Sequence, residues 1–169
     1  DHFALPEDEL SLARESGTLQ RNFQGYSTHA DCDLIGLGIS AIGRVGDSYS
    51  QNAKELSQYY AQLKSDRLPV KRGYRLNDDD HLRGEVISAL MCHGRIDFAS
   101  IEKRYSIDFT DYFAAELDRL GEFANDGLVE IQRKTLILLP AGHLLMRSVA
   151  MVFDAYLDSE TPKRFSRIV

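Results

Sequence analysis

The polar run from His29 to Asp33 carries side chains of the types that bind metal ions: His29, Asp31, Cys32 and Asp33. Imidazole, thiolate and carboxylate groups are common ligands of zinc and iron. Neighbouring positions in one short loop cannot all point at a single ion without a distant partner. Polar turns use the same residue types to accept hydrogen bonds from their own backbone. We therefore predict a turn here and assign it no metal ligand and no catalytic residue.

Residues 36–41, Gly-Leu-Gly-Ile-Ser-Ala, fit the phosphate-binding pattern G-x-G-x-x-G/A. That pattern binds phosphate where a strand turns into a helix, because the helix N-terminus then faces the phosphate. Here the apolar run continues and meets Gly43 and Gly46, where a helix would have to begin. A buried strand is therefore favoured over a nucleotide site.

The stretch Leu34–Ile42 organises the elements of the first half. It is apolar apart from glycines and one serine, and it is too short for an isolated helix. Such a run predicts a strand buried on both faces. A helix is predicted before it, from Pro6 to about Glu15, and another after it, with Asn52 as N-cap and Glu55 as capping-box partner. This order suits the last units of a βα barrel.

A change of composition predicts a linker at residues 66–80, between a first domain at 1–65 and a second at 81–169. The linker contains Pro69, Gly73, an acidic triplet at 78–80 and four basic residues, namely Arg67, Lys71, Arg72 and Arg75. A solvated basic linker is the simpler interpretation of these four charges.

The second domain reads as mostly helical. An apolar stripe from Leu82 to Met91 predicts a helix that Gly94 closes, and Asp97 and Thr110 are the predicted caps of the next two helices. A hairpin around residues 133–134 and a final helix over 141–157 follow. Three helices, a hairpin and a closing helix is the order of a winged helix, so the predicted fold class is α+β.

Composition limits the classes of function. The chain has 169 residues, 43% of them hydrophobic and 27% charged, which is ordinary for a globular protein. A formal net charge of −6 and a pI near 5.3 argue against coating nucleic acid or an anionic membrane. The two cysteines, Cys32 and Cys92, form no C-x-x-C pair and predict reduced thiols in a cytoplasmic protein.

Residues 22–43, NFQGYSTHADCDLIGLGISAIG, resemble a segment near the end of the catalytic barrel of bacterial oxygen-independent coproporphyrinogen III oxidases. The resemblance runs along the chain, from Asp1-His2-Phe3-Ala4 through residues 105–109, YSIDF, to Phe165-Ser166-Arg167. It implies the last βα segments of a radical S-adenosylmethionine barrel followed by a winged-helix-like C-terminal domain.

The resemblance also implies a reaction. In these enzymes a reduced 4Fe-4S cluster cleaves S-adenosylmethionine, and the resulting radical starts the oxidative decarboxylation of two propionates of coproporphyrinogen III. The products are the vinyl groups of protoporphyrinogen IX, in haem biosynthesis. By position, Phe23, Gln24 and Ile42 match residues lining a pocket for a second S-adenosylmethionine. Arg72 and Arg75 become candidates for binding propionates, as do Lys163, Arg164 and Arg167 in the tail, and His2 lies at an expected barrel strand end.

One departure from the family is large, because the cluster motif C-x-x-x-C-x-x-C is absent from this sequence. We therefore expect the chain to be a piece of a longer enzyme, inactive alone, whose cluster ligands lie upstream. The rest of its own barrel would be its partner, although a dimer pairing two exposed strand edges is an alternative.

Two other classes of function compete with the oxidase. One is a winged-helix DNA-binding protein, against which the acidic third helix argues: residues 108–126 carry six acidic side chains and only Arg119. The other is a haem-binding relative of the oxidases. The phrase NFQGY at residues 22–26 favours the oxidase over that relative.

Overall fold

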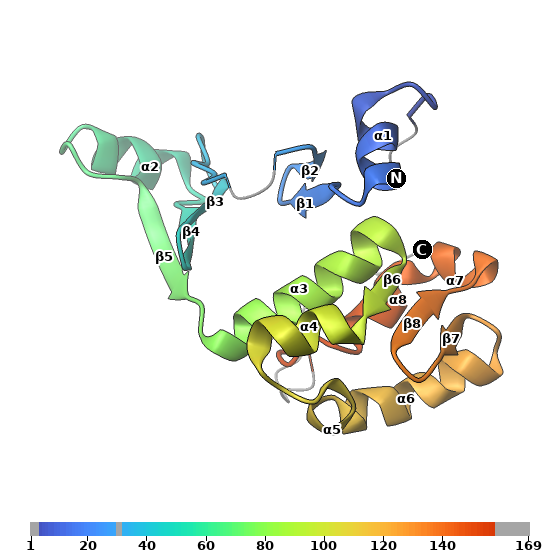
Figure 1. Cartoon of the computed structure of the whole chain (residues 1–169). Coiled ribbons are helices and arrows are strands. Elements are labelled where there is room, and N and C mark those ends of the chain that lie inside the picture. Colours follow the sequence, from blue (N-terminus) through green and yellow to red (C-terminus); the bar gives the residue numbers. More distant parts are fainter. Residues whose placement is uncertain (1–3, 30–31, 158–169) are drawn as a thin grey trace. The chain divides into compact units, whose positions relative to one another are not determined.

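The computed structural model describes residues 4–29 and 32–157, and Figure 1 draws the chain from blue at its N-terminus to red at its C-terminus. The chain contains helices and antiparallel strands without a regular alternation of the two, so it is of the α+β class. It divides into two compact units, Asp1–His93 and Gly94–Val169. Each unit is described by itself. His2 and the tail residues Lys163, Arg164 and Arg167 lie outside the described residues.

The first unit begins with a capped helix and a small hairpin. Helix α1 (Glu9–Ser16) starts after Asp8, whose side chain accepts a hydrogen bond from the Leu10 N–H, and ends at Gly17 in the left-handed conformation. The predicted first helix is thus confirmed, with its start at Glu9. Strands β1 (Gln20–Asn22) and β2 (Gly25–Ser27) pair antiparallel across a tight turn.

A small apolar cluster holds α1, this hairpin and the end of helix α3 (Asp78–His93) together. It consists of Ala13, Leu19 and Cys92, with Leu10 and Tyr26 packed against them. The Tyr26 hydroxyl donates to the Met91 carbonyl at 3.1 Å. Burial raises the pKa of the Cys92 thiol, which therefore stays protonated and packs as an apolar side chain.

The predicted buried strand at Leu34–Ile42 is wrong for most of its length. Residues 35–41 form a loop, and Leu34, just before it, makes an isolated bridge with Arg44 of the neighbouring sheet. The side chains of Ile35 and Leu37 are 74% and 86% exposed. Side chains fix the loop: the Asn52 amide nitrogen donates to the carbonyls of Gly36 and Gly38, each at 2.9 Å.

Three antiparallel strands follow this loop, in the order β3–β4–β5. They are β3 (Ile42–Val45), β4 (Ser48–Asn52) and β5 (Val70–Arg75). Asn52 ends β4 and does not cap a helix, so the predicted capping box is wrong. Helix α2 (Leu56–Leu63) instead starts after Glu55, which makes no capping bond from its side chain. Asn52 is only 7% exposed, because its amide is used inside the fold.

The predicted linker at 66–80 contains ordered elements. Strand β5 occupies residues 70–75, and the acidic triplet at 78–80 forms the first turn of α3, where its charge is favourable to the helix dipole. The apolar stripe of α3 is confirmed, since Leu82, Val86 and Leu90 are all buried.

The second unit contains the three-stranded sheet β6–β8–β7 and five helices among its described residues. The strands are β6 (Arg95–Asp97), β7 (Val129–Ile131) and β8 (Thr135–Leu138). The helices are α4 (Phe98–Tyr105), α5 (Phe109–Tyr112), α6 (Ala114–Asn125), α7 (Pro140–Leu144) and α8 (Met146–Met151). The predicted hairpin is confirmed as β7 and β8.

Four phenylalanines form the centre of this unit. Phe98 stacks on Phe109 with ring centroids 4.1 Å apart, Phe109 contacts Phe113 at 4.7 Å, and Phe113 meets Phe153 edge-on at 5.3 Å. The last three rings are fully buried. They join α4, α5, α6 and the segment after α8 into one core.

Two predicted helix boundaries in this unit are wrong. Asp108, not Thr110, caps the third helical segment, by accepting from the Asp111 N–H at 2.9 Å. The single helix expected over 141–157 is divided into α7 and α8 at Leu145. The cap at Asp97 is confirmed, because its side chain accepts from the Ala99 N–H.

Candidate functional site

The register of β3, β4 and β5 decides which side chains share a face of the small sheet. Ile42 pairs with Gln51, and Gln51 pairs with Arg72. Residues paired across antiparallel strands project to the same face. These three side chains therefore form one row across the sheet.

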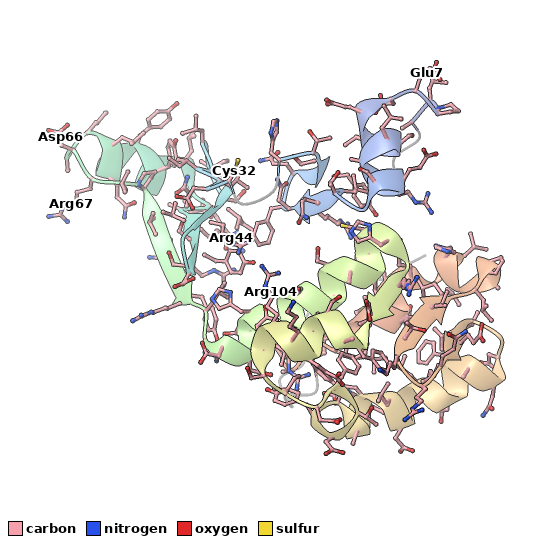
Figure 2. The ribbon with its side chains drawn as sticks, viewed as in Figure 1. Glu7, Cys32, Arg44, Asp66, Arg67 and Arg104 are labelled. Carbon is pink, nitrogen blue, oxygen red and sulfur yellow. The ribbon has the colours of Figure 1, made fainter. Side chains whose placement is uncertain are left out.

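A second row lies on the same face, two residues away from the first row on each of the three strands. Arg44 pairs with Tyr49, and Tyr49 pairs with Tyr74. Arg44 is labelled in Figure 2 and projects from β3. This face of the sheet thus carries two arginines, two tyrosines, a glutamine and an isoleucine.

A pocket of about 360 Å³ lies over these rows. It is lined by Phe23, Ile42, Tyr49, Ser50, Gln51, Arg72, Gly73 and Tyr74. Three residues selected from separate stretches of the sequence, Phe23, Ile42 and Arg72, therefore line one pocket. Apolar and aromatic walls with a few polar groups are typical of small-molecule sites.

Phe23 reaches the pocket from the turn between β1 and β2. Its ring meets Tyr49 edge-on, with centroids 5.2 Å apart, although 53% of its surface remains exposed. The turn is fixed by the Asn22 side chain, which accepts a hydrogen bond from the Gln24 N–H at 2.8 Å. Gln24 itself is exposed and is not among the residues that line the pocket.

The polar side chains of the pocket are held by neighbours. The Arg72 Nε donates to the Gln51 Oε1 at 2.8 Å, and the Gln51 Nε2 donates to the Ser40 carbonyl at 3.1 Å. The Tyr74 hydroxyl donates to Asp80 Oδ2 at 3.0 Å. Asp80 in turn accepts from the Asn77 N–H at the start of α3.

The two arginines proposed for substrate lie on opposite faces of β5. Arg72 faces the pocket, whereas Arg75 pairs with Ser48 and belongs to the other face. Side chains alternate along a strand, so positions three apart cannot share a face. Sequence reasoning grouped them because it treated 66–80 as a linker.

Sequence reasoning missed Tyr49, Gln51 and Tyr74. The dipeptide Gly46-Asp47 between β3 and β4 was an available signal, because a two-residue Gly-Asp loop is typical of a β-hairpin. A hairpin there would have placed Tyr49 and Gln51 on one face.

The structure does not confirm the turn predicted at residues 29–33, because His29, Cys32 and Asp33 lie in irregular backbone and Asp33 bonds to a residue distant in sequence. Asp33 Oδ1 accepts from the Gly46 N–H at 2.9 Å, and the His29 N–H donates to the Ser27 hydroxyl at 3.0 Å. Asp31 lies outside the described residues. No group of three or more His, Cys, Asp or Glu suited to a metal ion occurs in residues 4–29 and 32–157. Over the same residues, no helix is long and apolar enough to cross a membrane.

Comparisons with known proteins found one family model that matches part of this chain and relatives that align with all of it. Residues 76–145 match the family described as HemN C-terminal domain. Oxygen-independent coproporphyrinogen III oxidase from Pseudomonas aeruginosa is 49% identical over 169 residues, and that from Escherichia coli is 46% identical over 170. Each alignment covers all of this chain and 37% of the relative, so the chain spans little more than a third of their length.

The solved structure of coproporphyrinogen III oxidase (HemN) from Escherichia coli, described as a radical SAM enzyme, has the same fold over most of the chain. It superposes with a TM-score of 0.90 and 47% sequence identity, covering 93% of this chain and 36% of that one.

Proposed function

This chain belongs to the oxygen-independent coproporphyrinogen III oxidase family, and on that premise we propose that it forms part of an enzyme that decarboxylates coproporphyrinogen III without oxygen. The observation that carries the proposal is the pocket in the first unit, where Phe23, Ile42 and Arg72 come together. In the proposed reaction each of two propionates would lose carbon dioxide, one hydrogen atom and one electron to become a vinyl group, which gives protoporphyrinogen IX. The hydrogen atom would go to a radical derived from S-adenosylmethionine, and the electron would go to an external acceptor.

Within that enzyme, the residues of this chain would bind and orient the ligands. Phe23 and Ile42 provide an apolar wall suited to the adenosyl part of S-adenosylmethionine, and Arg72 provides a cation for a carboxylate. When bound, S-adenosylmethionine and a 4Fe-4S cluster would together supply the radical chemistry that starts the reaction. We propose that the cluster ligands lie in a part of the enzyme outside this chain, because the motif C-x-x-x-C-x-x-C is absent from this sequence.

The finer structural assignments are also part of the proposal. Residues 1–65 would form the last βα segments of a radical SAM barrel, and residues 81–169 would form a winged-helix-like packing module. Several further points stay predictions. They are a domain boundary near residue 75, a role for Gln24 in the pocket, a cytoplasmic location, dimerisation through a strand edge and the absence of nucleic-acid partners.

The test uses the full-length protein that contains this chain, reconstituted anaerobically with iron and sulfide and supplied with S-adenosylmethionine, a reductant and an electron acceptor. We expect it to consume coproporphyrinogen III and release protoporphyrinogen IX. The Phe23→Ala variant is expected to raise the KM for S-adenosylmethionine about tenfold, because part of the apolar wall is lost. Leu144→Ala, at an 88% exposed site in the second unit, is the control.

The 169-residue chain alone is expected to bind no stoichiometric iron and to give no turnover in the same assay. Iron binding and turnover by the chain alone would contradict the assignment of the cluster to another part of the enzyme. Haem binding without turnover by the full-length protein would instead identify a haem-binding relative.

A further inference from the structure

We infer that Gln51 is the positioning residue that orients Arg72 to bind a ligand carboxylate in the pocket. The inference rests on the proposed function for the ligands that it names, and it assigns to Gln51 a role that the sequence did not predict. It begins from the geometry of the row Ile42–Gln51–Arg72 on the small sheet.

Gln51 is bound at both ends of its amide. Its Oε1 accepts from the Arg72 Nε at 2.8 Å, and its Nε2 donates to the Ser40 carbonyl at 3.1 Å. Ser40 is held in turn, with a left-handed φ of 55° and its N–H bonded to the Ala53 carbonyl at 2.9 Å. The amide therefore has one orientation in which both bonds are made, and a flipped amide would lose both.

This contact uses the guanidinium in a specific way. A guanidinium has five N–H donors, and Gln51 takes the one on Nε. Within residues 4–29 and 32–157 the structure records no partner for the four donors on the two terminal nitrogens, which form the planar fork that matches the two oxygens of a carboxylate. Gln51 is neutral, so it orients Arg72 without neutralising its charge.

The surroundings define the class of ligand. Arg72 lies in the pocket with Phe23, Tyr49 and Tyr74, and the Tyr74 ring is held by its bond to Asp80. An aromatic wall beside an arginine fits a ligand with a planar ring and a carboxylate. Both S-adenosylmethionine and coproporphyrinogen III have that chemistry, and the experiment separates them.

The experiment measures dissociation constants with the full-length protein that contains this chain. The probes are coproporphyrin III, S-adenosylmethionine and decarboxylated S-adenosylmethionine. Arg72→Ala is expected to weaken a carboxylate probe about tenfold, because a charge-assisted bond is lost, and to leave the decarboxylated probe unchanged. Gln51→Leu is expected to weaken the same probe about threefold, because Arg72 keeps its charge but loses the hydrogen bond that fixes its orientation. Arg75→Ala removes an identical charge from the opposite face of β5 and is the matched control.

A double-mutant cycle distinguishes positioning from a general structural effect. If Gln51 acts through Arg72, then Gln51→Leu has no further effect when Arg72 is already Ala or Lys. Arg72→Lys also serves as a second variant, since it keeps the charge and leaves the Gln51 bond to Ser40 intact. Circular dichroism on each variant establishes that the fold is retained.

Equal effects of Gln51→Leu in both backgrounds, or no effect in the parent sequence, would overturn the inference. Coproporphyrin III binding that is insensitive to both residues would also overturn it while leaving the proposed function standing. S-adenosylmethionine binding with the expected coupling, without porphyrin binding, would support the inference and count against the porphyrin assignment. Failure of all the probes to bind overturns the inference, and the turnover assay then decides the function separately.

Discussion

Asn52 is the side chain on which the loop at residues 35–41 depends most directly. It is 7% exposed, and its amide nitrogen donates to the carbonyls of Gly36 and Gly38, each at 2.9 Å. Asn52→Ala removes both bonds and leaves the two carbonyls to find water. A neutral hydrogen bond contributes about 1 kcal/mol net, so the expected loss in the free energy of unfolding is about 2–3 kcal/mol.

Urea denaturation measures this loss. With a slope of about 1–3 kcal/mol per molar urea, the midpoint of the first unit should fall by about 1 M. Asn52→Asp should destabilise at least as much, because it replaces the donor with a second acceptor that faces two carbonyl oxygens. Asn125→Ala, at the exposed end of α6, is the control and should shift the midpoint little.

Hydrogen exchange gives a local readout of the same change. The Gly38 N–H donates to the Tyr59 hydroxyl at 3.1 Å, and the Ser40 N–H donates to the Ala53 carbonyl at 2.9 Å. Both amides should lose protection in Asn52→Ala if the side chain holds the loop. An unchanged urea midpoint together with unchanged protection would refute the reasoning, and would mean that the backbone bonds alone determine the loop.

Three further predictions concern the core, the backbone and pH. Phe113→Ala should lower the free energy of unfolding by about 3–5 kcal/mol, because a fully buried ring leaves a cavity, whereas Leu144→Ala at an exposed site should change it by less than about 0.5 kcal/mol. Gly142→Ala should strongly lower the thermal midpoint, because the added Cβ would collide with the Leu128 carbonyl. Gly121→Ala has open space around its added Cβ within α6 and should raise the free energy of unfolding by about 0.5–1 kcal/mol, so thermal denaturation should shift the two variants in opposite directions. Burial, with a smaller contribution from Arg14, lowers the pKa of His93 in the folded protein. Near and below the ordinary histidine pKa of about 6.5 the unfolded chain therefore binds more protons than the folded one, and the free energy of unfolding should fall as the pH drops. Urea denaturation at about pH 7.5 and about pH 5.5 measures this fall, which should be smaller in His93→Leu.

Local rules were enough to predict several helix boundaries from the sequence. Asp97 before α4, and Gly17 and Gly94 after α1 and α3, satisfy the exposed backbone groups at helix ends, an interaction between residues close in sequence. The apolar stripe of α3 was also predictable, because residues three or four positions apart lie on the same face of a helix. Phe23 and Ile42 were predicted as pocket residues from the family resemblance, because no local sequence rule connects these two positions.

Tertiary structure decided the parts that depend on pairing between distant strands. The sequence alone read Leu34–Ile42 as a buried strand because it is apolar, but the actual strands β3, β4 and β5 contain many polar residues and are recognised only by their mutual pairing. That pairing made Asn52 the side chain that holds the loop, and it brought Gln51 beside Arg72. It also placed Arg72 and Arg75 on opposite faces of β5, because side chains alternate between the two faces of a strand. A linker without secondary structure would impose no such alternation, so the linker prediction could not separate the two arginines.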